Sequence, residues 1–246
     1  MSGYAVESTY GKPDVGLMTL TEMAARASQI VDSVNLPVIS DADTGFGNVI
    51  NVVRTVREFE RAGVVAIQIE DQALPKKCGS MQGKSIVSKR EMIGKIKAVL
   101  DARSDDNFLL IARSDALAVE GLAATEDRLQ AYKEAGADLL MVLGPYDLSQ
   151  ARKFITNSPA PHAYLDSESF TMPMIPVKEL ERLGAKLAIF PLAITLSAAH
   201  AIRRTLKVIR ESGTTEAYAK DNMLSWAECN DVLGFRDIQD QEKKYL

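Results

Sequence analysis

Apolar residues recur along the chain in two alternating patterns, which together predict a repeated strand-helix unit. Helical spacing is clear after Thr19, where a capping box with Glu22 precedes apolar residues three and four positions apart. Short, unbroken apolar runs such as 64–69 and 108–112 are typical of strands buried on both faces. A helix, an Ala-Gly or Leu-Gly pair and an apolar strand follow one another three times, at Gly63, Gly136 and Gly184.

The number of units favours a closed parallel barrel. Counting from residues 2–6, interpreted as a strand remnant, the pattern gives about seven units against the eight that a barrel needs. We therefore predict an α/β fold, a (β/α)8 TIM-type barrel that lacks or shortens its first unit. A doubly wound open sheet is the competing architecture. It would place a glycine-rich phosphate turn after its first strand, and Gly45-Phe46-Gly47 is too short and too acidic for that turn.

The end of the chain carries more apolar helix than a barrel requires. We predict a single domain over residues 1–246, with a barrel core at 1–213 and a C-terminal helical extension at 214–246. A surplus apolar helix often serves a subunit interface. The apolar positions of the extension are Met223, Leu224, Trp226, Val232, Leu233 and Phe235.

Composition narrows the classes of partner. The 246 residues have a net charge of -4 with both signs interleaved, so no basic patch for nucleic acid or a membrane surface is expected. No apolar stretch approaches the length of a membrane span, and the N-terminus lacks the pattern of a signal peptide. Two cysteines, Cys78 and Cys229, are too few for a disulfide scaffold. A cytoplasmic location is expected, or a mitochondrial or peroxisomal one in a eukaryote.

Acidic side chains follow the predicted strands. The stretch from Pro37 to Gly47 reads as a buried strand that ends in Asp41, Asp43 and a glycine turn. On an extended backbone these two carboxylates leave on the same face, where a hard cation such as Mg2+ relieves their repulsion. A loop with a helix N-cap aspartate is the simpler alternative. Glu70, Asp71, Arg113 and Asp115 also end strands, and a barrel gathers such residues at one mouth.

A long loop follows Glu70 and carries a cysteine. Residues 71–84 exceed most strand-helix loops, and long loops at an active face are often lids. Cys78 follows Lys76 and Lys77, which are expected to favour its thiolate, and precedes the unobstructed Gly79. A catalytic role for Cys78 is therefore predicted.

Three ordered motifs resemble those of one enzyme superfamily. They are D-A-D-T-G-F-G at 41–47, I-E-D-Q-x-x-P-K-K-C-G at 69–79 and A-R-S-D-A at 112–116. The chain resembles the isocitrate lyase and phosphoenolpyruvate mutase superfamily, in particular its branch of 2-methylisocitrate lyase, 2,3-dimethylmalate lyase and petal death protein. The similarity runs from Ser2 to about Gly213 and into the tail. It implies a Mg2+-dependent barrel, with Mn2+ as a substitute, and a last barrel helix exchanged within a homodimer or homotetramer.

The resemblance also implies a site. Metal ligands, direct or through water, would be Asp14, Asp41, Asp43 and Glu70. Catalytic residues would be Cys78, which exchanges a proton with the enolate carbon, Arg113, which holds substrate oxygen, and Lys76. Substrate-binding residues would be Ser2, Gly3, Asp41, Gly79, Ser80 and Arg113.

Three positions depart from the family pattern. Ser80 stands where lyases of this branch have a histidine, and Leu143 replaces the acid of V-E-x-P. The N-x-x-E motif has no clean match in 164–168, where Asp166 or Glu168 substitutes only in part. An apolar residue cannot relay a proton, so a changed substrate or chemistry is expected.

Three functions follow as hypotheses. The leading one is a Mg2+-dependent carbon-carbon lyase that cleaves a small 2-hydroxy di- or tricarboxylate, of the 2-methylisocitrate or 2,3-dimethylmalate type, through a pyruvate-like enolate. The second is a hydrolase or repurposed biosynthetic enzyme of the same superfamily, of the oxaloacetate or phosphonopyruvate hydrolase kind. The third is a catalytically inactive barrel that serves as a binding or assembly subunit.

Overall fold

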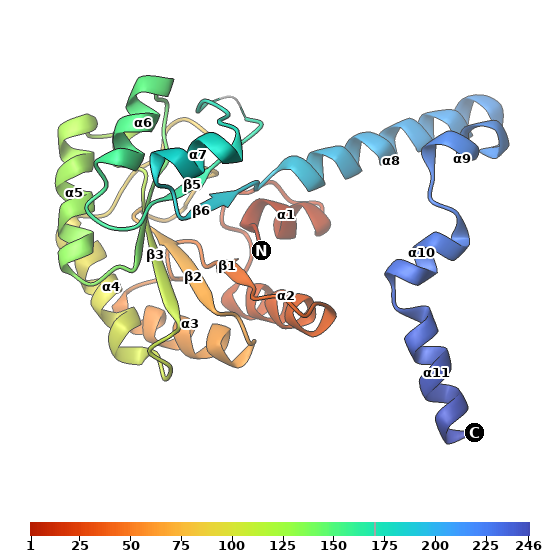
Figure 1. Cartoon of the computed structure of the whole chain (residues 1–246). Coiled ribbons are helices and arrows are strands. Elements are labelled where there is room, and N and C mark those ends of the chain that lie inside the picture. The colour runs from red at the N-terminus through yellow and green to blue at the C-terminus, as the bar shows by residue number, and fades with distance from the viewer. Residues whose placement is uncertain (170) are drawn as a thin grey trace. The chain divides into compact units, whose positions relative to one another are not determined.

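Strands and helices alternate along the chain as the apolar pattern predicts (Figure 1). The computed structural model describes residues 1–169 and 171–246. The strands are β1 (Ile39–Asp41), β2 (Ala66–Glu70), β3 (Leu109–Ser114), β4 (Leu139–Val142), β5 (Ala163–Leu165) and β6 (Leu187–Ile189). The helices are α1 (Gly3–Thr9), α2 (Leu20–Ser33), α3 (Val49–Arg61), α4 (Lys89–Ala102), the short 3-10 helix η1 (Ala116–Ala118), α5 (Leu122–Glu134), α6 (Leu148–Thr156), α7 (Val177–Leu183), α8 (Ala193–Ser212), α9 (Glu216–Asn222), α10 (Trp226–Val232) and α11 (Phe235–Tyr245).

The strands follow one another in chain order and run parallel. β1 to β4 form one sheet, and β5 pairs with β6. A single parallel bridge between Leu140 and His162 joins the two groups. In the described residues, β6 and β1 are not paired to close the ring. The order of strands is that of a TIM-type barrel, in which each strand is followed by a helix on the outside.

The start of the chain differs from the prediction. Residues 2–6 are not a strand remnant, because Gly3–Thr9 form helix α1. Ser2 caps this helix, and its hydroxyl accepts a hydrogen bond from the amide of Ala5 at 3.4 Å. Only Met1 joins the sheet edge, where its carbonyl accepts from the amide of Asp41. The described residues therefore contain six strand-helix units rather than about seven.

The amphipathic helices pack their apolar faces on the sheet. In α3, Asn48 is the N-cap of the helix, and Val52, Val56 and Phe59 are fully buried. These three residues are spaced three and four apart, as the sequence pattern required. Figure 1 shows α3, α4 and α5 side by side along one side of the strands. This packing fixes the strands whose carboxyl ends build the site.

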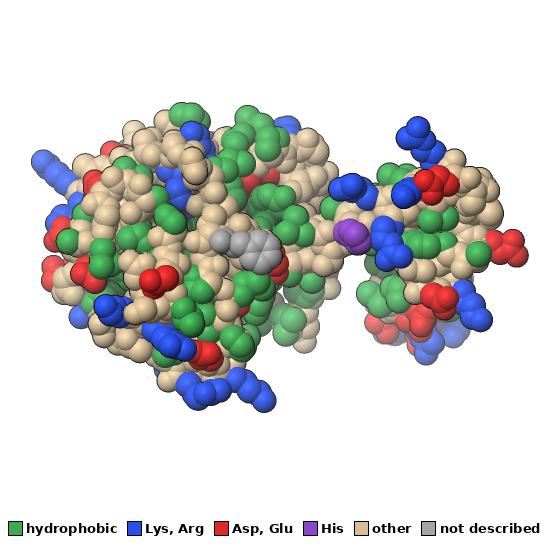
Figure 2. Space-filling view, turned by 90° about the horizontal axis from the view of Figure 1, so that it is seen from above, with side chains coloured by type: hydrophobic (Ala, Val, Ile, Leu, Met, Phe, Trp, Pro, Cys, Tyr) green, Lys and Arg blue, Asp and Glu red, His purple; other side chains and the backbone are tan. Residues whose placement is uncertain are grey.

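The chain divides into two compact units, Met1–Thr195 and Leu196–Leu246. The division falls inside α8. In the second unit, none of the described residues of helices α9 to α11 is buried. Figure 2 shows hydrophobic side chains among the charged ones on its surface. In the described part of the chain, we find no helix with the length and apolar content to cross a bilayer.

Candidate active site

The end of β1 places two carboxylates together through a turn. The strand stops at Asp41, and Asp43 takes a left-handed backbone conformation with φ of 47°. The amide of Asp43 donates to Oδ1 of Asp41 at 3.0 Å. Asp41 and Asp43 are therefore neighbours because the backbone turns, and not because they alternate along an extended strand. Aspartate tolerates this conformation better than most side chains.

Strand register brings the next residues beside them. Asp41 pairs with Gln68 across β1 and β2, and Glu70 pairs with Arg113 across β2 and β3. Residues paired in this way point to the same face of a parallel sheet. The Arg113 guanidinium accordingly lies 2.6 Å from Glu70 Oε2, and Gln68 Nε2 lies 3.5 Å from Asp41 Oδ1. Nothing local in the sequence marked Gln68 as part of the site.

Lys76 occupies the centre of the acids, which the sequence did not predict. Its ammonium makes an ion pair with Asp14 and lies 2.7 Å from Asp43 Oδ1. Asp14, Asp41, Asp43 and Glu70, here called the acid cluster, thus gather at one mouth, with a cation already among them. As they stand, no three carboxylate, thiol or imidazole groups of the described residues converge closely enough to hold an ion. The predicted metal ligands lie close to one another, but Lys76 occupies the space between them.

Burial makes the charges of the cluster costly. It raises the pKa of Asp43 to about 7, a shift that the charge of Asp41 reinforces and Lys76 opposes. Burial also raises the pKa of Glu70 well above its usual range, against the effect of Arg113. Burial alone would lower the pKa of Lys76, but the surrounding acids, Asp43 first, raise it above its usual value.

The charge count of the mouth fits a divalent cation. When ionised, the four carboxylates of the acid cluster face two side-chain cations, Lys76 and Arg113, which leaves two negative charges. Oε1 of Glu70 is buried and, among the described residues, has no hydrogen-bond partner. Buried carboxylates of this kind are normally paired or coordinate a metal. Hard oxygen ligands with room for water suit Mg2+.

The loop that carries Cys78 folds back over the mouth. Residues 71–87, here called the lid, begin and end in a short antiparallel contact, with the amide of Ala73 donating to Ser85 at 2.8 Å. The amide of Cys78 donates to the carbonyl of Asp14 at 3.0 Å. This hydrogen bond holds the cysteine beside the acid cluster.

The neighbouring lysines do not favour a thiolate, contrary to prediction. Lys76 is engaged by the acids, and the ammonium of Lys77 donates to the carbonyl of Gly83 at 2.8 Å. Burial raises the pKa of Cys78, and the nearby charge of Asp14 raises it further. The side chain is therefore a thiol at neutral pH, which can donate a proton.

A cavity of about 530 Å³ opens between the lid and the barrel. Its polar end has Ser2, Asp14, Asp41, Gln68 and Arg113. Apolar side chains form much of the remainder, among them Ile111, Leu143, Leu165, Ile189 and Leu192. Cys78, Gly79 and Ser80 line it from the lid.

Two glycines approach the cavity residues too closely for a side chain. A Cβ at Gly3 would lie 2.7 Å from Oδ2 of Asp41, to which the Gly3 amide donates at 3.2 Å. A Cβ at Gly79 would lie 2.2 Å from Cδ2 of Leu143 and 2.8 Å from Nη2 of Arg113. Both predicted glycines are thus at the site. Gly3 places a backbone donor on Asp41, and Gly79 lets the lid touch the barrel.

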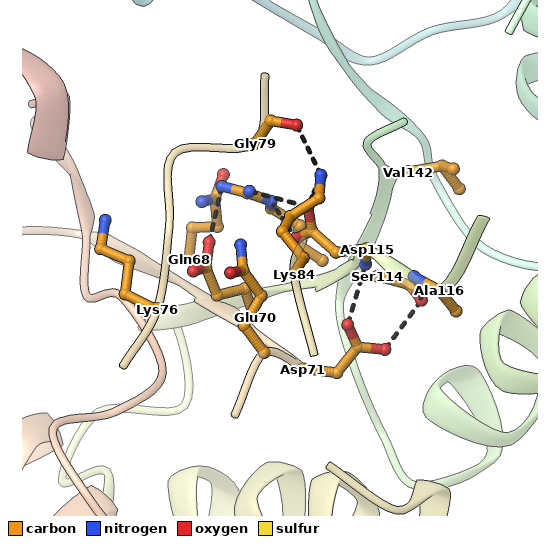
Figure 3. A network of polar contacts seen from close by, with 12 residues as sticks. Gln68, Glu70, Asp71, Lys76, Gly79, Lys84, Ser114, Asp115, Ala116 and Val142 are labelled. Atoms are coloured by element: carbon orange, nitrogen blue, oxygen red, sulfur yellow. Dashed lines mark hydrogen bonds and ion pairs between the residues drawn. The ribbon is translucent and has the colours of Figure 1, made fainter. Parts of the chain in front are cut away.

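A buried network behind the cavity fixes Arg113 (Figure 3). Nε of Arg113 lies 2.9 Å from Asp115 Oδ2, and Lys84 Nζ lies 2.8 Å from Asp115 Oδ1. Asp71 accepts hydrogen bonds from Ser114 and from the amide of Asp115, each at 2.8 Å. Asp71 and Asp115 therefore support Arg113 and the backbone that follows it. Lys84 was not predicted.

The remaining candidates lie elsewhere. Asp166 Oδ2 accepts from the amide of Ile175 at 3.2 Å, so this acid supports the backbone rather than the cavity. His162 is buried and His200 is exposed, and neither lines the cavity. Cys229 is exposed in its own unit, so it is not a core residue there.

This arrangement defines an enzyme class. A parallel barrel-type fold holds acids, an arginine and a lid thiol over a cavity at the carboxyl ends of its strands, where enzymes of this fold bind substrate. The model of the phosphoenolpyruvate phosphomutase family matches residues 1–210, and the chain belongs to this family.

Individual relatives sharpen the comparison. The 2,3-dimethylmalate lyase of Eubacterium barkeri is 43% identical over 246 residues, covering 100% of this chain and 85% of the relative. The 2-methylisocitrate lyase of Aeropyrum pernix is 41% identical over 242 residues, covering 98% and 78%. A crystal structure of 2,3-dimethylmalate lyase, a PEP mutase/isocitrate lyase superfamily member, superposes with a TM-score of 0.92 at 31% identity, covering 100% of this chain and 82% of that one.

One solved neighbour contains the expected ion. Phosphonopyruvate hydrolase in complex with oxalate and Mg++ superposes with a TM-score of 0.89 at 28% identity, covering 99% of this chain and 85% of that one. The superfamily resemblance read from the three motifs is confirmed.

Proposed function

We propose that this chain is a Mg2+-dependent carbon-carbon lyase that cleaves a small 2-hydroxy dicarboxylate or tricarboxylate. The observation that carries the proposal is the convergence of four carboxylates on two side-chain cations, Lys76 and Arg113, under a protonated lid thiol. The similarity to two named lyases, at 43% and 41% identity, supports the choice of reaction.

The acid cluster would hold the ion. Asp14, Asp41, Asp43 and Glu70 offer carboxylate oxygens, directly or through water, and an ion there would take the place of Lys76 beside Asp14 and Asp43. When bound, Mg2+ would chelate the 2-hydroxy acid and favour negative charge on its oxygen. Arg113 is held rigidly by Glu70 and Asp115, so it can bind substrate oxygen without reorganising.

The chain's own residues account for the proton transfers. A carboxylate of the cluster takes the proton of the 2-hydroxyl group, and C2 becomes a carbonyl carbon as the C2-C3 bond breaks. The electron pair of that bond moves to C3, whose carboxylate becomes an enolate. Cys78 donates its thiol proton to C3. The proton taken from the 2-hydroxyl group returns to Cys78, so all atoms of the substrate are found in the two product acids. A thiol with a raised pKa suits this donor role.

Leu143 favours a substrate with an alkyl group over one with a third carboxylate. It is 5% exposed, lines the cavity and packs against Gly79. Among the described residues lining the cavity, Arg113 is the one side-chain cation, so an extra carboxylate would find no second side-chain cation to pair with. An unpaired buried charge is costly. A 2,3-dialkylmalate is therefore the preferred substrate type.

Steady-state assays test the proposal. We expect Mg2+-dependent release of pyruvate from 2,3-dimethylmalate, with kcat/KM at least about tenfold above that for 2-methylisocitrate. Cleavage of neither compound, with or without Mg2+, contradicts the proposed function. An equal kcat/KM for the two compounds would support the lyase function but contradict the role of Leu143 in selecting the substrate.

Hydrolysis of a 2-oxo acid is the second candidate. Ser80 lines the cavity from the lid, where the lyases of the resembled branch have a histidine, and the hydrolase neighbour superposes closely. Release of oxalate from oxaloacetate, without cleavage of dimethylmalate, would favour this function. An inactive assembly subunit would instead show no turnover, and neither Cys78→Ser nor Asp41→Ala would change any measured property.

We also propose that the second unit mediates a homodimer or homotetramer by helix exchange. Its apolar residues are exposed within its own unit, including Trp226 at 76% and Val232 at 80%. Large apolar side chains of this kind normally contact a partner. Light scattering of the full chain should give a dimer or tetramer mass. Trp226→Ser with Val232→Ser should shift it toward monomer, whereas a monomeric wild-type chain contradicts the proposal.

A further inference from the structure

Lys84 lies at the end of the lid and connects it to the network behind Arg113 (Figure 3). Its side chain is 3% exposed, although it belongs to a surface loop. Nζ donates to the carbonyl of Gly79 at 2.5 Å and lies 2.8 Å from Oδ1 of Asp115. A buried ammonium with two charged or polar partners is a specific structural element rather than a solvated lysine.

The structure assigns Lys84 as a positioning residue that holds the lid closed, by joining the Gly79 carbonyl to the carboxylate that fixes Arg113. This inference rests on the proposed function, in which Cys78 donates a proton to carbon. Asp115 contacts both Lys84 and Arg113, and Gly79 directly follows Cys78. One ammonium therefore sets the thiol segment relative to the arginine that would hold the substrate.

The close contact of Gly79 with the barrel also constrains the position of the thiol relative to Arg113. A Cβ at Gly79 would overlap Leu143 and Arg113, so the lid backbone lies directly against both. A shift of Gly79 away from this contact would move the adjacent Cys78 relative to Arg113. Lys84 is the lid side chain whose hydrogen bond pulls the Gly79 carbonyl toward the network. Water exclusion and the direction of proton delivery both depend on such a closed lid.

Lys77 provides a matched control in the same loop. Its ammonium also donates to lid carbonyls, Gly83 at 2.8 Å and Gln82 at 3.5 Å. The described residues show no acid paired with it. Replacing Lys77 removes the same charge and a similar number of lid hydrogen bonds, but leaves the link to Asp115 intact.

Alkylation of Cys78 by iodoacetamide tests the inference without any need for turnover. The background is Cys229→Ser, so that one thiol reacts. We expect Lys84→Met to raise the labelling rate at least about tenfold, because a buried charged hydrogen bond holding the lid is lost. Lys77→Met should stay within about twofold of the parent. A Lys84→Met rate that is also within that range overturns the inference, even if the lyase proposal is correct.

A second readout uses the product of the reaction in D2O. Delivery of the proton from one face gives a single deuterated enantiomer of the released acid. Lys84→Met should give a mixture of the two enantiomers, since solvent reaches the carbanion carbon from both faces when the lid is loose. Retained stereochemistry in Lys84→Met contradicts the inference.

Lys84→Arg guards against a folding artefact. Arginine keeps the charge, but its larger planar guanidinium cannot lie between the Gly79 carbonyl and Asp115 as the compact ammonium does, so we expect labelling and stereochemistry between those of the parent and Lys84→Met. If Lys84→Met does not fold, Lys84→Arg alone decides. In that case, labelling and stereochemistry identical to the parent's would overturn the inference.

Discussion

Glu70 and Asp71 are adjacent and fully buried, yet their surroundings differ. Asp71 accepts hydrogen bonds from the Ser114 hydroxyl, the Asp115 amide and the Tyr132 hydroxyl, the last at 2.7 Å. Glu70 has Arg113 on one oxygen, and in the described structure its other oxygen has no hydrogen-bond partner. The fold supplies hydrogen-bond partners to both oxygens of Asp71, whereas one oxygen of Glu70 can still accept a bond from a ligand.

This difference separates supporting acids from functional ones. Burial raises the pKa of Asp71, but its hydrogen bonds oppose that shift. In the acid cluster, neighbouring carboxylates add to the rise in pKa that burial causes for Asp43 and Glu70. Removing one of these charges should therefore lower activity rather than stability. Substitutions in the acid cluster should therefore lower activity and spare stability, whereas substitutions of the supporting acids should lower stability and spare Mg2+ binding.

The largest effect is expected for Asp43→Asn. We expect kcat/KM to fall about 10³-fold or more, because a metal ligand contributes several kcal/mol to the barrier. The free energy of unfolding should stay equal or rise, since the pKa of Asp43, about 7, shows that its charge is costly in the folded state. Urea denaturation alongside kinetics checks both. A large loss of stability would place Asp43 with the supporting acids.

Cys78→Ser should have the next largest effect. Loss of a positioned general acid typically lowers kcat about 10²- to 10⁴-fold, and a serine hydroxyl is a much weaker acid than a thiol. Mg2+ binding should be unchanged, since the thiol is not in the acid cluster. Cys229→Ser is the matched control and should leave kcat as it is. A decrease in kcat of less than about fivefold would remove Cys78 as proton donor.

Asp71→Asn should have the opposite effect to Asp43→Asn, lowering stability rather than Mg2+ binding. We expect the free energy of unfolding to fall by about 2 to 4 kcal/mol, because a buried charge with several donors is lost beside Arg128. The folded fraction should keep its Mg2+ affinity. Urea denaturation measures the change in stability, and calorimetry measures the affinity for Mg2+. Unchanged stability together with lost Mg2+ binding would show that Asp71 was assigned to the wrong group.

The smallest effect concerns a buried group outside both regions. Burial lowers the pKa of His162 to about 4. Since the unfolded chain then binds a proton more tightly than the folded one, stability should be full above pH about 6.5 and fall as pH decreases toward 4. The loss attributable to His162 is about 2 to 3 kcal/mol. His162→Gln should flatten this part of the pH curve, and His200→Gln on α8 should not. Identical curves for both variants would contradict it.

Local patterns predicted most of the fold, because each helix and strand carries its own periodicity. Val52, Val56 and Phe59 of α3 are buried as their spacing required. The acids at the ends of β1 and β2 gather because parallel strands end at one edge. Residues 2–6 were misassigned because so short a segment has no measurable period, and its Ser2 cap was the stronger signal.

What the sequence did not predict depends on contacts between distant residues. The position of Lys76 between Asp14 and Asp43 joins a lid to two separate loops. The pKa of Cys78 depends on burial and on Asp14, whereas sequence proximity suggested the lysines beside it. Gln68 and Lys84 acquire their roles from strand register and lid closure, which no local motif encodes.

Calorimetric titration with Mg2+ tests the central claim most directly. Wild-type protein should show one saturable site, tighter with oxalate present, and Asp43→Asn should weaken it at least about tenfold. Absence of binding heat and of any thermal shift in the wild-type chain, with and without oxalate, would contradict the account.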